Sequence, residues 1–318
     1  MKKEIFCTLG PSSLNKKFLK FSNNKISLLR INLSHISINK LSKTIKFIRK
    51  YSRVPICLDT EGAQIRTKSK YKKFFKKNDL LKFSKNKGKF RLYPDDVFKK
   101  IKNKDILDIG FEGLKVKVFK KNFSSIICKI ISEGIFQGDK GVHLTNRKIK
   151  LNFITEKDKL AILIGKKLNI NNYALSFTNS QADVFNFNKL LKSEKKIFKI
   201  ETKNAIKNLP KIMSSGQRFL IDRGDLSKDI KIEELPYLQR VILKLGNKKK
   251  KKIYVATNFL ESMLFNKYPL KGEINDIYNT LELGASGLVL AAETAIGKYP
   301  KECVILLKKI IKVFKKYN

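Results

Sequence analysis

The chain has 318 residues, of which 42% are apolar and 10% aromatic, enough to bury a large core and to exclude wholesale disorder. This length predicts about two domains, or one large α/β barrel with an insertion. The chain carries 70 Lys and Arg residues against 27 Asp and Glu, a formal net charge of +43, yet only nine of the 70 are arginines. Because sequence-specific readers of nucleic acid rely on bidentate arginines, we expect no specific nucleic-acid function and only non-specific attraction to polyanions.

The cysteines and the N-terminal residues bear on the cellular compartment. Cys7, Cys57, Cys128 and Cys303 lie far apart and form neither a CxxC pair nor a metal-ligand spacing with histidine. Residues 1–10 lack the apolar segment of a signal peptide, and no apolar run reaches the ~20 residues that a membrane span needs. We therefore expect a cytoplasmic protein with reduced thiols and no membrane contact.

Eight short runs of β-branched and other apolar residues recur along the chain, and nearly all are followed by segments with helical periodicity. In order, these predicted strands are 5–10, 25–34, 54–60, 173–177, 195–201, 218–224, 252–258 and 287–294. Segment 38–50 is a predicted helix with Leu41, Ile45 and Ile48 on one stripe, and the helix predicted over 271–283 ends before Gly284. Strands that alternate with helices predict a parallel sheet, and eight of them predict a (β/α)8 TIM barrel.

One interval interrupts this alternation. Between residues 67 and 144 the chain consists of short strand-like runs separated by Gly, Asn and Asp, a pattern typical of antiparallel β structure. Removing the interval leaves roughly 240 residues, close to the ~250 typical of a TIM barrel. We therefore predict a barrel domain formed by 1–66 and 145–318, with 67–144 as a small inserted antiparallel β-barrel-like lid domain after the third barrel strand.

Polar side chains gather where the predicted barrel strands end. In TIM barrels the C-terminal ends of the strands carry the chemistry, so we expect these side chains to converge. Converging polar and charged groups predict a site for a phosphate or a carboxylate. The residues are Thr8, Arg30, Asn32, Ser34, Asp59, Thr60, Ser176, Lys199, Glu201, Arg223, Asp225, Thr257, Glu293 and Thr294.

Ten segments, in chain order, resemble the motifs of the pyruvate kinase family. They are CTLGPSS (7–13), RINLSH (30–35), LDTEGAQIRT (58–67), KGVHL (140–144), TEKD (155–158), ALSF (174–177), KIE (199–201), RGDL (223–226), VATNFLESM (255–263) and ETAIGKYP (293–300). The resemblance covers essentially the whole chain. It departs at the C-terminus, where the family usually continues into another domain and this chain ends at Asn318, so we expect the C-terminal effector domain to be absent.

The resemblance implies an activity: transfer of the phosphoryl group of phosphoenolpyruvate to ADP, which gives pyruvate and ATP in glycolysis. Such a transfer needs positive charge around a highly anionic transition state. By resemblance, Lys199 is the cation on the transferring phosphoryl group, Arg30 is a second phosphate clamp, and Thr257 is tied to protonation of the enolate through water. The resemblance also implies that Glu201 and Asp225 ligate Mg²⁺, an ion that prefers carboxylate oxygens.

The same resemblance assigns the remaining site residues. It implies a K⁺ site at Asn32, Ser34, Asp59 and Thr60. We expect K⁺ to be needed because Asp59 without a counterion would place negative charge beside the phosphate. The phosphoenolpyruvate site is implied at Lys199, Gly224, Asp225, Thr257, Ser176 and Phe177. In it, the N–H groups of Gly224 and Asp225 would receive the substrate carboxylate. The nucleotide site is implied at Arg30, Asn32, His35, Arg66 and Lys140.

Alternatives stay open. Without the motifs, Glu201 and Asp225 are equally well explained as ion pairs with lysines, the K⁺ set as strand-end caps, and His35 as a structural hydrogen-bond partner. The rival functions are an altered phosphoenolpyruvate or keto-acid reaction, and a weakly active relic that acts as a basic binding protein. A homo-oligomer formed through the barrel is also open.

The chain departs from the family pattern near the site. The departures include Asp222, Glu61, Gln64 and Ala291. Asp222 stands where the family usually has a small alanine, directly before the RGD segment. A carboxylate at this position is expected to repel an anionic substrate unless a cation neutralises it.

Overall fold

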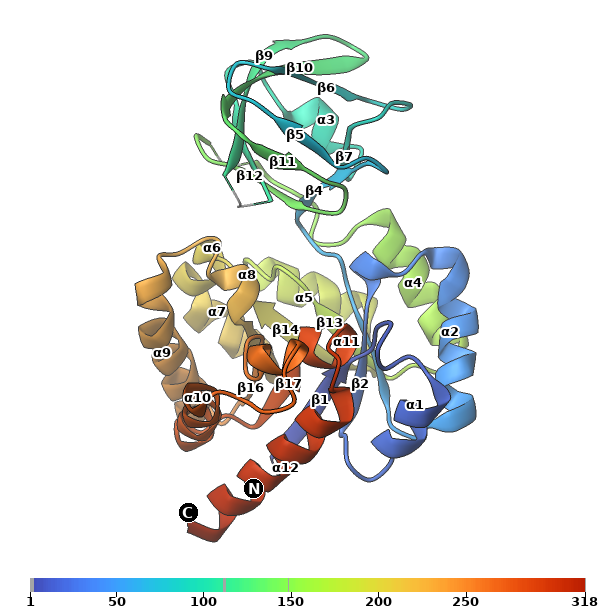
Figure 1. The fold of residues 1–318 in the computed structure, drawn as a ribbon, viewed down its shortest axis with the longest axis vertical. Helices are drawn as coiled ribbons and strands as arrows, with labels where there is room; N and C mark the ends of the chain where they lie inside the picture. Colours follow the sequence, from blue (N-terminus) through green and yellow to red (C-terminus); the bar gives the residue numbers. More distant parts are fainter. Residues whose placement is uncertain (1–2, 111–112, 148, 318) are drawn as a thin grey trace. The chain divides into compact units, whose positions relative to one another are not determined.

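The computed structural model describes residues 3–110, 113–147 and 149–317, so the last residue of the chain, Asn318, lies outside the described part. The chain divides into two compact units (Figure 1). One unit comprises Met1–Gly62 and Glu156–Asn318, and the other comprises Ala63–Thr155. Each unit has a hydrophobic core of its own.

Eight parallel strands close into a barrel in the first unit, with β1 beside both β2 and β17. The strands are β1 (Glu4–Thr8), β2 (Leu28–Asn32), β3 (Ile56–Asp59), β13 (Asn172–Leu175), β14 (Lys195–Ile200), β15 (Arg218–Asp222), β16 (Lys252–Ala256) and β17 (Gly287–Leu290). Each overlaps one of the eight runs predicted from the sequence. The predicted TIM barrel is therefore confirmed.

Helices follow the strands and surround the barrel (Figure 1). They are α1 (Lys16–Ser22), α2 (Ile38–Tyr51), α4 (Glu156–Lys167), α5 (Gln181–Leu190), α6 (Lys203–Lys207), α7 (Leu209–Ser215), α8 (Arg223–Leu226), α9 (Leu235–Lys248), α10 (Lys271–Glu282), α11 (Ala292–Ala295) and α12 (Pro300–Tyr317), with short 3-10 turns η1 (Leu33–His35), η2 (Ile232–Glu234) and η3 (Glu261–Leu264). Among the described residues, no helix combines the length and the apolar character that crossing a membrane requires.

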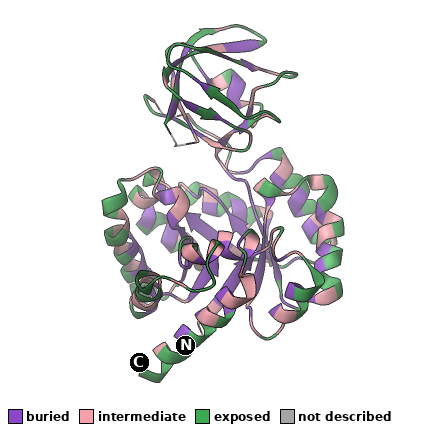
Figure 2. Cartoon of the chain, viewed as in Figure 1, coloured by how far each residue is buried: buried purple, intermediate pink, exposed green. Residues whose placement is uncertain are grey.

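The helices bury one face each, as Figure 2 shows by the purple segments that face the barrel. The predicted stripe of α2 is confirmed, because Leu41, Ile45 and Ile48 are its buried residues. The predicted end of α10 is confirmed as well. Gly284 follows the last turn with φ +90°, a left-handed conformation that glycine adopts without steric cost.

An apolar layer fills the barrel interior. Every strand contributes to it; its members are Phe6, Leu28, Cys57, Ala174, Ile197, Leu220, Tyr254, Ala256 and Val289. Side chains two positions apart on a strand point to the same face. The next inward position after six of these residues is polar: Thr8, Arg30, Asp59, Ser176, Lys199 and Asp222. The period of the strands thus places a polar layer directly above the apolar one.

The second unit is antiparallel β structure, which confirms the predicted insertion after the third barrel strand. Its elements are β4 (Ile65–Lys68), β5 (Lys73–Phe75), β6 (Leu80–Ser84), β7 (Arg91–Tyr93), α3 (Val97–Lys100), β8 (Ile106–Ile109), β9 (Leu114–Lys121), β10 (Ser125–Ser132), β11 (Gly134–Phe136) and β12 (Gly141–Leu144). A seven-stranded sheet runs in the order β6-β10-β9-β8-β12-β4-β7, and β11 pairs with β5.

This unit extends beyond the predicted range of 67–144 at both ends. At its start, Ile65 and Arg66 already pair with β12. At its end, Arg147 forms an ion pair with the buried Asp105 at 2.6 Å, and Ile149 packs against the core of the unit. Pairing and packing at these positions account for the wider range.

The buried stripe of α2 makes a stability prediction. We expect Ile45→Ala to lower the free energy of unfolding by about 2–5 kcal/mol, because it leaves a cavity under a fully buried side chain. The matched control is Lys46→Ala on the exposed face of the same helix, which should change stability by less than about 0.5 kcal/mol. Urea unfolding followed by circular dichroism measures both. Equal midpoints for the two variants would contradict the packing of α2.

Candidate active site

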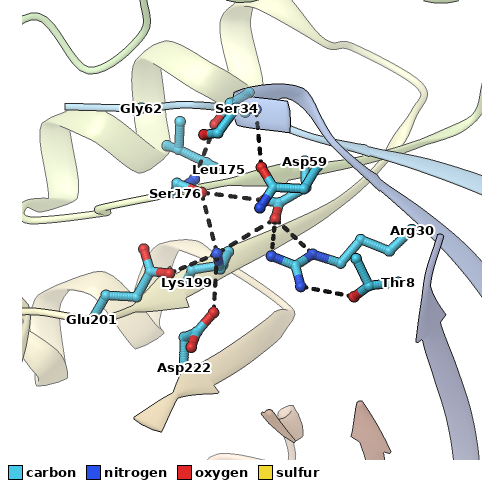
Figure 3. A network of polar contacts seen from close by, with 12 residues as sticks. Thr8, Arg30, Ser34, Asp59, Gly62, Leu175, Ser176, Lys199, Glu201 and Asp222 are labelled. Atoms are coloured by element: carbon cyan, nitrogen blue, oxygen red, sulfur yellow. Dashed lines mark hydrogen bonds and ion pairs between the residues drawn. The ribbon is translucent and has the colours of Figure 1, made fainter. Parts of the chain in front are cut away.

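The side chain of Lys199 lies at the centre of the polar layer (Figure 3). Its ammonium nitrogen lies 2.6 Å from Glu201 Oε1, 3.3 Å from Asp222 Oδ2 and 3.4 Å from Asp59 Oδ2. It also donates to Ser176 Oγ at 3.3 Å. Lys199 is only 3% exposed, so three carboxylates replace the water that a lysine usually keeps.

Arg30 joins this network through Asp59. Its Nε donates to Asp59 Oδ2 at 2.6 Å, a second guanidinium nitrogen pairs with the same oxygen, and Nη1 donates to Thr8 Oγ1 at 3.0 Å. Ser176 Oγ donates to the other oxygen, Asp59 Oδ1, at 3.2 Å. Asp59 therefore holds two buried cations side by side, which fixes where positive charge is presented at the barrel mouth.

Both cations stay charged in this setting. Burial alone would lower the pKa of Lys199, but Asp59, Glu201 and Asp222 outweigh it and raise that pKa well above its usual value. Burial likewise opposes the charge of Arg30, and Asp59 again outweighs it and raises the pKa. A phosphoryl-binding site needs charges that are present and oriented before the substrate arrives, and this pair meets that need.

The carboxylates respond differently to the same surroundings. Burial alone would raise the pKa of Asp222, but Lys199, Arg30 and the hydrogen bond from Thr257 lower it to about 2. Burial raises the pKa of Glu201 to about 8 despite Lys199, and the charges of Asp222 and Asp225 add to the rise. By geometry the carboxylates also outnumber the cations here, because Asp59, Glu201 and Asp222 share Lys199 and Arg30.

A divalent cation fits this excess. Glu201, Asp222 and Asp225 each offer a carboxylate oxygen, and these oxygens all lie within 4.8 Å of one another. An all-oxygen carboxylate set suits Mg²⁺, which usually takes one or two carboxylates together with water and substrate oxygens. Asp225 Oδ1 also pairs with Lys228 Nζ at 2.8 Å, and the Asp225 side chain is partly exposed. The all-oxygen donor set therefore suits a hard divalent ion.

Thr257 is held in place directly after β16. Its hydroxyl donates to Asp222 Oδ1 at 2.8 Å and accepts from the Gly224 N–H at 3.1 Å. Its backbone is left-handed, with φ +76°, which is costly for a β-branched residue. Two guanidinium nitrogens of Arg223 donate to the Thr257 carbonyl at 3.0 and 2.6 Å, and Asp276 holds Arg223 at 2.7 Å. These bonds hold the strained residue.

Comparison with known proteins agrees with the barrel. A family model described as "Pyruvate kinase, barrel domain" matches residues 1–304. The chain belongs to the pyruvate kinase family. Proteins named pyruvate kinase from Staphylococcus epidermidis and Geobacillus stearothermophilus are each 30% identical to the chain over 97% of its length, and one from Staphylococcus haemolyticus is 31% identical. The chain spans about half, 56%, of the length of these relatives.

The barrel brings together most of the residues that the resemblance to pyruvate kinase selects. Lys199, Arg30, Glu201, Asp59 and Ser176 form one network of contacts. Three further residues join it at its edges. The Phe177 N–H donates to Glu201 at 2.6 Å, Thr257 joins through Asp222, and Asp225 joins through the carboxylate cluster. The catalytic and binding roles assigned to these residues stay predictions.

The residues predicted to bind K⁺ already have partners within the protein. Asp59 does not lack a counterion, because Arg30 and Lys199 both pair with it. Asn32 and Thr60 also act as hydrogen-bond acceptors within the protein. Asn32 Oδ1 accepts from the Ser34 N–H at 3.0 Å and caps η1, and Thr60 Oγ1 accepts from the N–H of Ser176 at 3.0 Å. The expectation of uncompensated charge at Asp59 is wrong.

Other predicted binding residues lie in distinct surroundings. Gly224 lies in the single turn of α8. Its N–H, expected to receive the substrate carboxylate, donates to Thr257 Oγ1 instead. His35 is exposed at the end of η1. Arg66 and Lys140 belong to the inserted unit, where an Arg66 nitrogen donates to the Asp139 carbonyl at 3.4 Å. The nucleotide-binding role of these residues stays a prediction.

Two of the departures from the pyruvate kinase pattern find charged or hydrogen-bonding partners. Asp222, expected to repel substrate, is paired with Lys199 and Thr257, and Glu61 pairs with Lys157 at 2.8 Å. Ala291 is the residue two positions after Val289, so the polar layer has no hydroxyl there. The contact of Asp222 with Lys199 was missed from sequence. Its position two residues after the inward Leu220 was the available signal.

The burial of Lys199 generates a prediction that needs no activity assay. We expect Lys199→Met to lower the free energy of unfolding by about 3–5 kcal/mol, because it leaves buried carboxylates without their cation. Lys159→Met is the matched control, since Lys159 pairs with Glu156 on the exposed side of α4 and should contribute less than about 1 kcal/mol. Urea unfolding of both variants tests this. Unfolding midpoints that coincide would show that Lys199 is not a buried counterion.

Proposed function

We propose that this chain transfers the phosphoryl group of phosphoenolpyruvate to ADP, giving pyruvate and ATP, the reaction of glycolysis for which the family is named. The observation that carries the proposal is the pair of buried cations, Lys199 and Arg30, held by Asp59 at the C-terminal ends of the barrel strands. Membership of the pyruvate kinase family supports a phosphotransferase in general. The specific reaction, its substrates and its location in the cytoplasm are our proposals.

The proposed chemistry depends on positive charge that is already oriented. A loose phosphoryl-transfer transition state spreads negative charge over three oxygens, and preorganised cations stabilise it without reorganisation. Lys199 would face the transferring group. Carboxylates from β3, β15 and the residue after β14 already fix its ammonium, so this charge would need no reorganisation. Arg30 would clamp a second phosphate oxygen with Nη1, the one guanidinium nitrogen that does not pair with Asp59 and that here donates to Thr8.

A divalent ion completes the proposed site. Glu201 and Asp225 would hold Mg²⁺, with Asp222 beside them. When bound, the ion supplies further positive charge to substrate oxygens and offsets the negative charge around Glu201. The second half of the reaction needs a proton for the enolate carbon. We assign its delivery, through water, to the Thr257 corner of the site.

The remaining assignments concern binding. Ser176, Phe177 and Gly224 would line the phosphoenolpyruvate site, and Asn32, Ser34, Asp59 and Thr60 would surround K⁺. Nucleotide phosphates would bind Arg30, Asn32 and His35 on the barrel and Arg66 and Lys140 on the inserted unit. These follow from the resemblance, and the hydrogen bonds already made by Gly224, Asn32 and Thr60 would have to rearrange or be shared on binding.

A coupled assay tests the proposed reaction. Purified chain, phosphoenolpyruvate, ADP, Mg²⁺ and K⁺ should give pyruvate, detected by NADH consumption with lactate dehydrogenase. We expect Lys199→Met, checked for folding by circular dichroism, to lower kcat by about 10²- to 10³-fold or more, because one preorganised cation is lost. Lys159→Met should keep the rate of the unchanged chain.

The outcomes separate the rival functions. Turnover in Lys199→Met equal to that of the unchanged chain would remove Lys199 from the mechanism. Consumption of phosphoenolpyruvate without pyruvate, seen by ³¹P and ¹H NMR, would favour an altered phosphoenolpyruvate or keto-acid reaction. Consumption of neither substrate would favour the relic that binds polyanions through its charge.

The K⁺ site is tested by replacing the monovalent cation. We expect added KCl, compared with tetramethylammonium chloride at constant ionic strength, to raise kcat by about tenfold or less, a barrier change of ~1.4 kcal/mol. The effect is modest because Arg30 and Lys199 already compensate Asp59. Tetramethylammonium is too large for a site lined by oxygens of this kind. Equal rates in the two salts would mean that the chain uses no K⁺.

A further inference from the structure

We propose that Asp222 is a positioning residue of this site: its carboxylate sets the direction of the Thr257 O–H and anchors the Lys199 ammonium, so that the groups for the two halves of the reaction are held together. The inference rests on the proposed function and goes beyond it, because the family resemblance assigns no role to this position. It also reverses the expectation that Asp222 hinders the substrate.

The geometry places one carboxylate between two groups. Asp222 is the last residue of β15, is 6% exposed and lies one inward step above Leu220 of the apolar layer. Its Oδ1 accepts from Thr257 Oγ1 at 2.8 Å, while its Oδ2 lies 3.3 Å from Lys199 Nζ. Figure 3 shows the carboxylate pointing at the ammonium from the side opposite Ser176. Each oxygen therefore serves one partner.

Hydrogen-bond chemistry then determines how Thr257 is used. A hydroxyl has one donor hydrogen, and an ionised carboxylate only accepts. Thr257 must therefore donate to Asp222, and it accepts from the Gly224 N–H at 3.1 Å. One lone pair of the hydroxyl oxygen is left. Thr257 can therefore accept a hydrogen bond from a water molecule, but it has no hydrogen left to donate to that water. Without Asp222 the hydroxyl would be free to rotate.

The charge balance explains why Asp222 need not weaken substrate binding. Its carboxylate pairs with Lys199 at 3.3 Å and accepts from the Thr257 hydroxyl at 2.8 Å, so it is not a free charge facing the substrate. Repulsion of an anionic substrate requires an uncompensated charge, and this one is paired. Loss of Asp222 is thus expected to affect the rate of the bound complex more than the binding of phosphoenolpyruvate.

The test compares Asp222→Ala, which loses both contacts, with Asp222→Asn, which keeps an oxygen for Thr257 and loses the charge opposite Lys199. We expect Asp222→Ala to lower kcat by about 10- to 100-fold while KM for phosphoenolpyruvate changes by less than about threefold. Asp222→Asn should lose less. Asp96→Asn is the control, because it removes the charge of a partly exposed Asp–Lys pair in the inserted unit and should leave both kcat and KM unchanged.

A second measurement isolates the proton step. Exchange of the pyruvate methyl protons with D₂O, followed by ¹H NMR, needs no ADP, and inorganic phosphate with Mg²⁺ can fill the place of the transferred group. We expect Asp222→Ala to slow this exchange by about 10- to 100-fold. If Asp222 acts through Thr257, the variant with both Asp222→Ala and Thr257→Ala should be no slower than Thr257→Ala, within about twofold.

These readouts keep the two proposals apart. Exchange by the unchanged chain without pyruvate formation from phosphoenolpyruvate and ADP would overturn the proposed function and leave the role of Asp222 standing. A lowered KM with unchanged kcat in both Asp222 variants would overturn the inference and restore the repulsive role. Additive losses in the double variant, or no exchange by the unchanged chain, would also overturn it. Asp222→Asn, close to isosteric, decides the matter if Asp222→Ala does not fold.

Discussion

A lysine ammonium that is removed from water must be surrounded by anions, because an unpaired buried charge costs several kcal/mol. In this barrel Lys199 meets the requirement with Asp59 on β3, Glu201 directly after β14 and Asp222 at the end of β15. The carboxylates have the same need, and Arg30 shares Asp59 with Lys199 to satisfy it. Because the partners lie on separate strands, the network exists only when the barrel has closed.

The barrel supplies this closure through its apolar layer. Phe6, Leu28, Cys57 and their counterparts on the other strands pack across the interior. The polar layer begins at the next inward position of six of the eight strands. The same two-residue period that makes the core therefore fixes the height and direction of the charged side chains. Side chains positioned on strands in this way are rigid, which is the condition for preorganised electrostatic stabilisation.

Acidic residues are scarce in this lysine-rich chain, and their placement is informative. Of the 27, seven are buried among the described residues: Asp59, Glu61, Asp105, Asp158, Glu201, Asp222 and Glu293. All but Asp105 belong to the barrel unit. Besides the three around Lys199, Asp158 accepts from the N–H groups of Glu61 and Gly62, and Glu293 accepts from those of Phe259 and Leu260. The buried carboxylates thus pair with the buried cations and accept hydrogen bonds from the loops beside them.

The sequence by itself determined the eight strands, the inserted antiparallel unit and the family, because burial periodicity and motif order are local properties of the chain. It also determined that Lys199, Arg30 and Glu201 share one end of a barrel. Only the tertiary structure decided which charges meet. Asp222 lies opposite Ala256 in the register of β15 and β16, which brings its carboxylate to Thr257, and the packing of β14 beside β15 brings it to Lys199. The counterions of Asp59 were likewise hidden in sequence, since pairing across strands depends on register and barrel closure and on no pattern within a single segment.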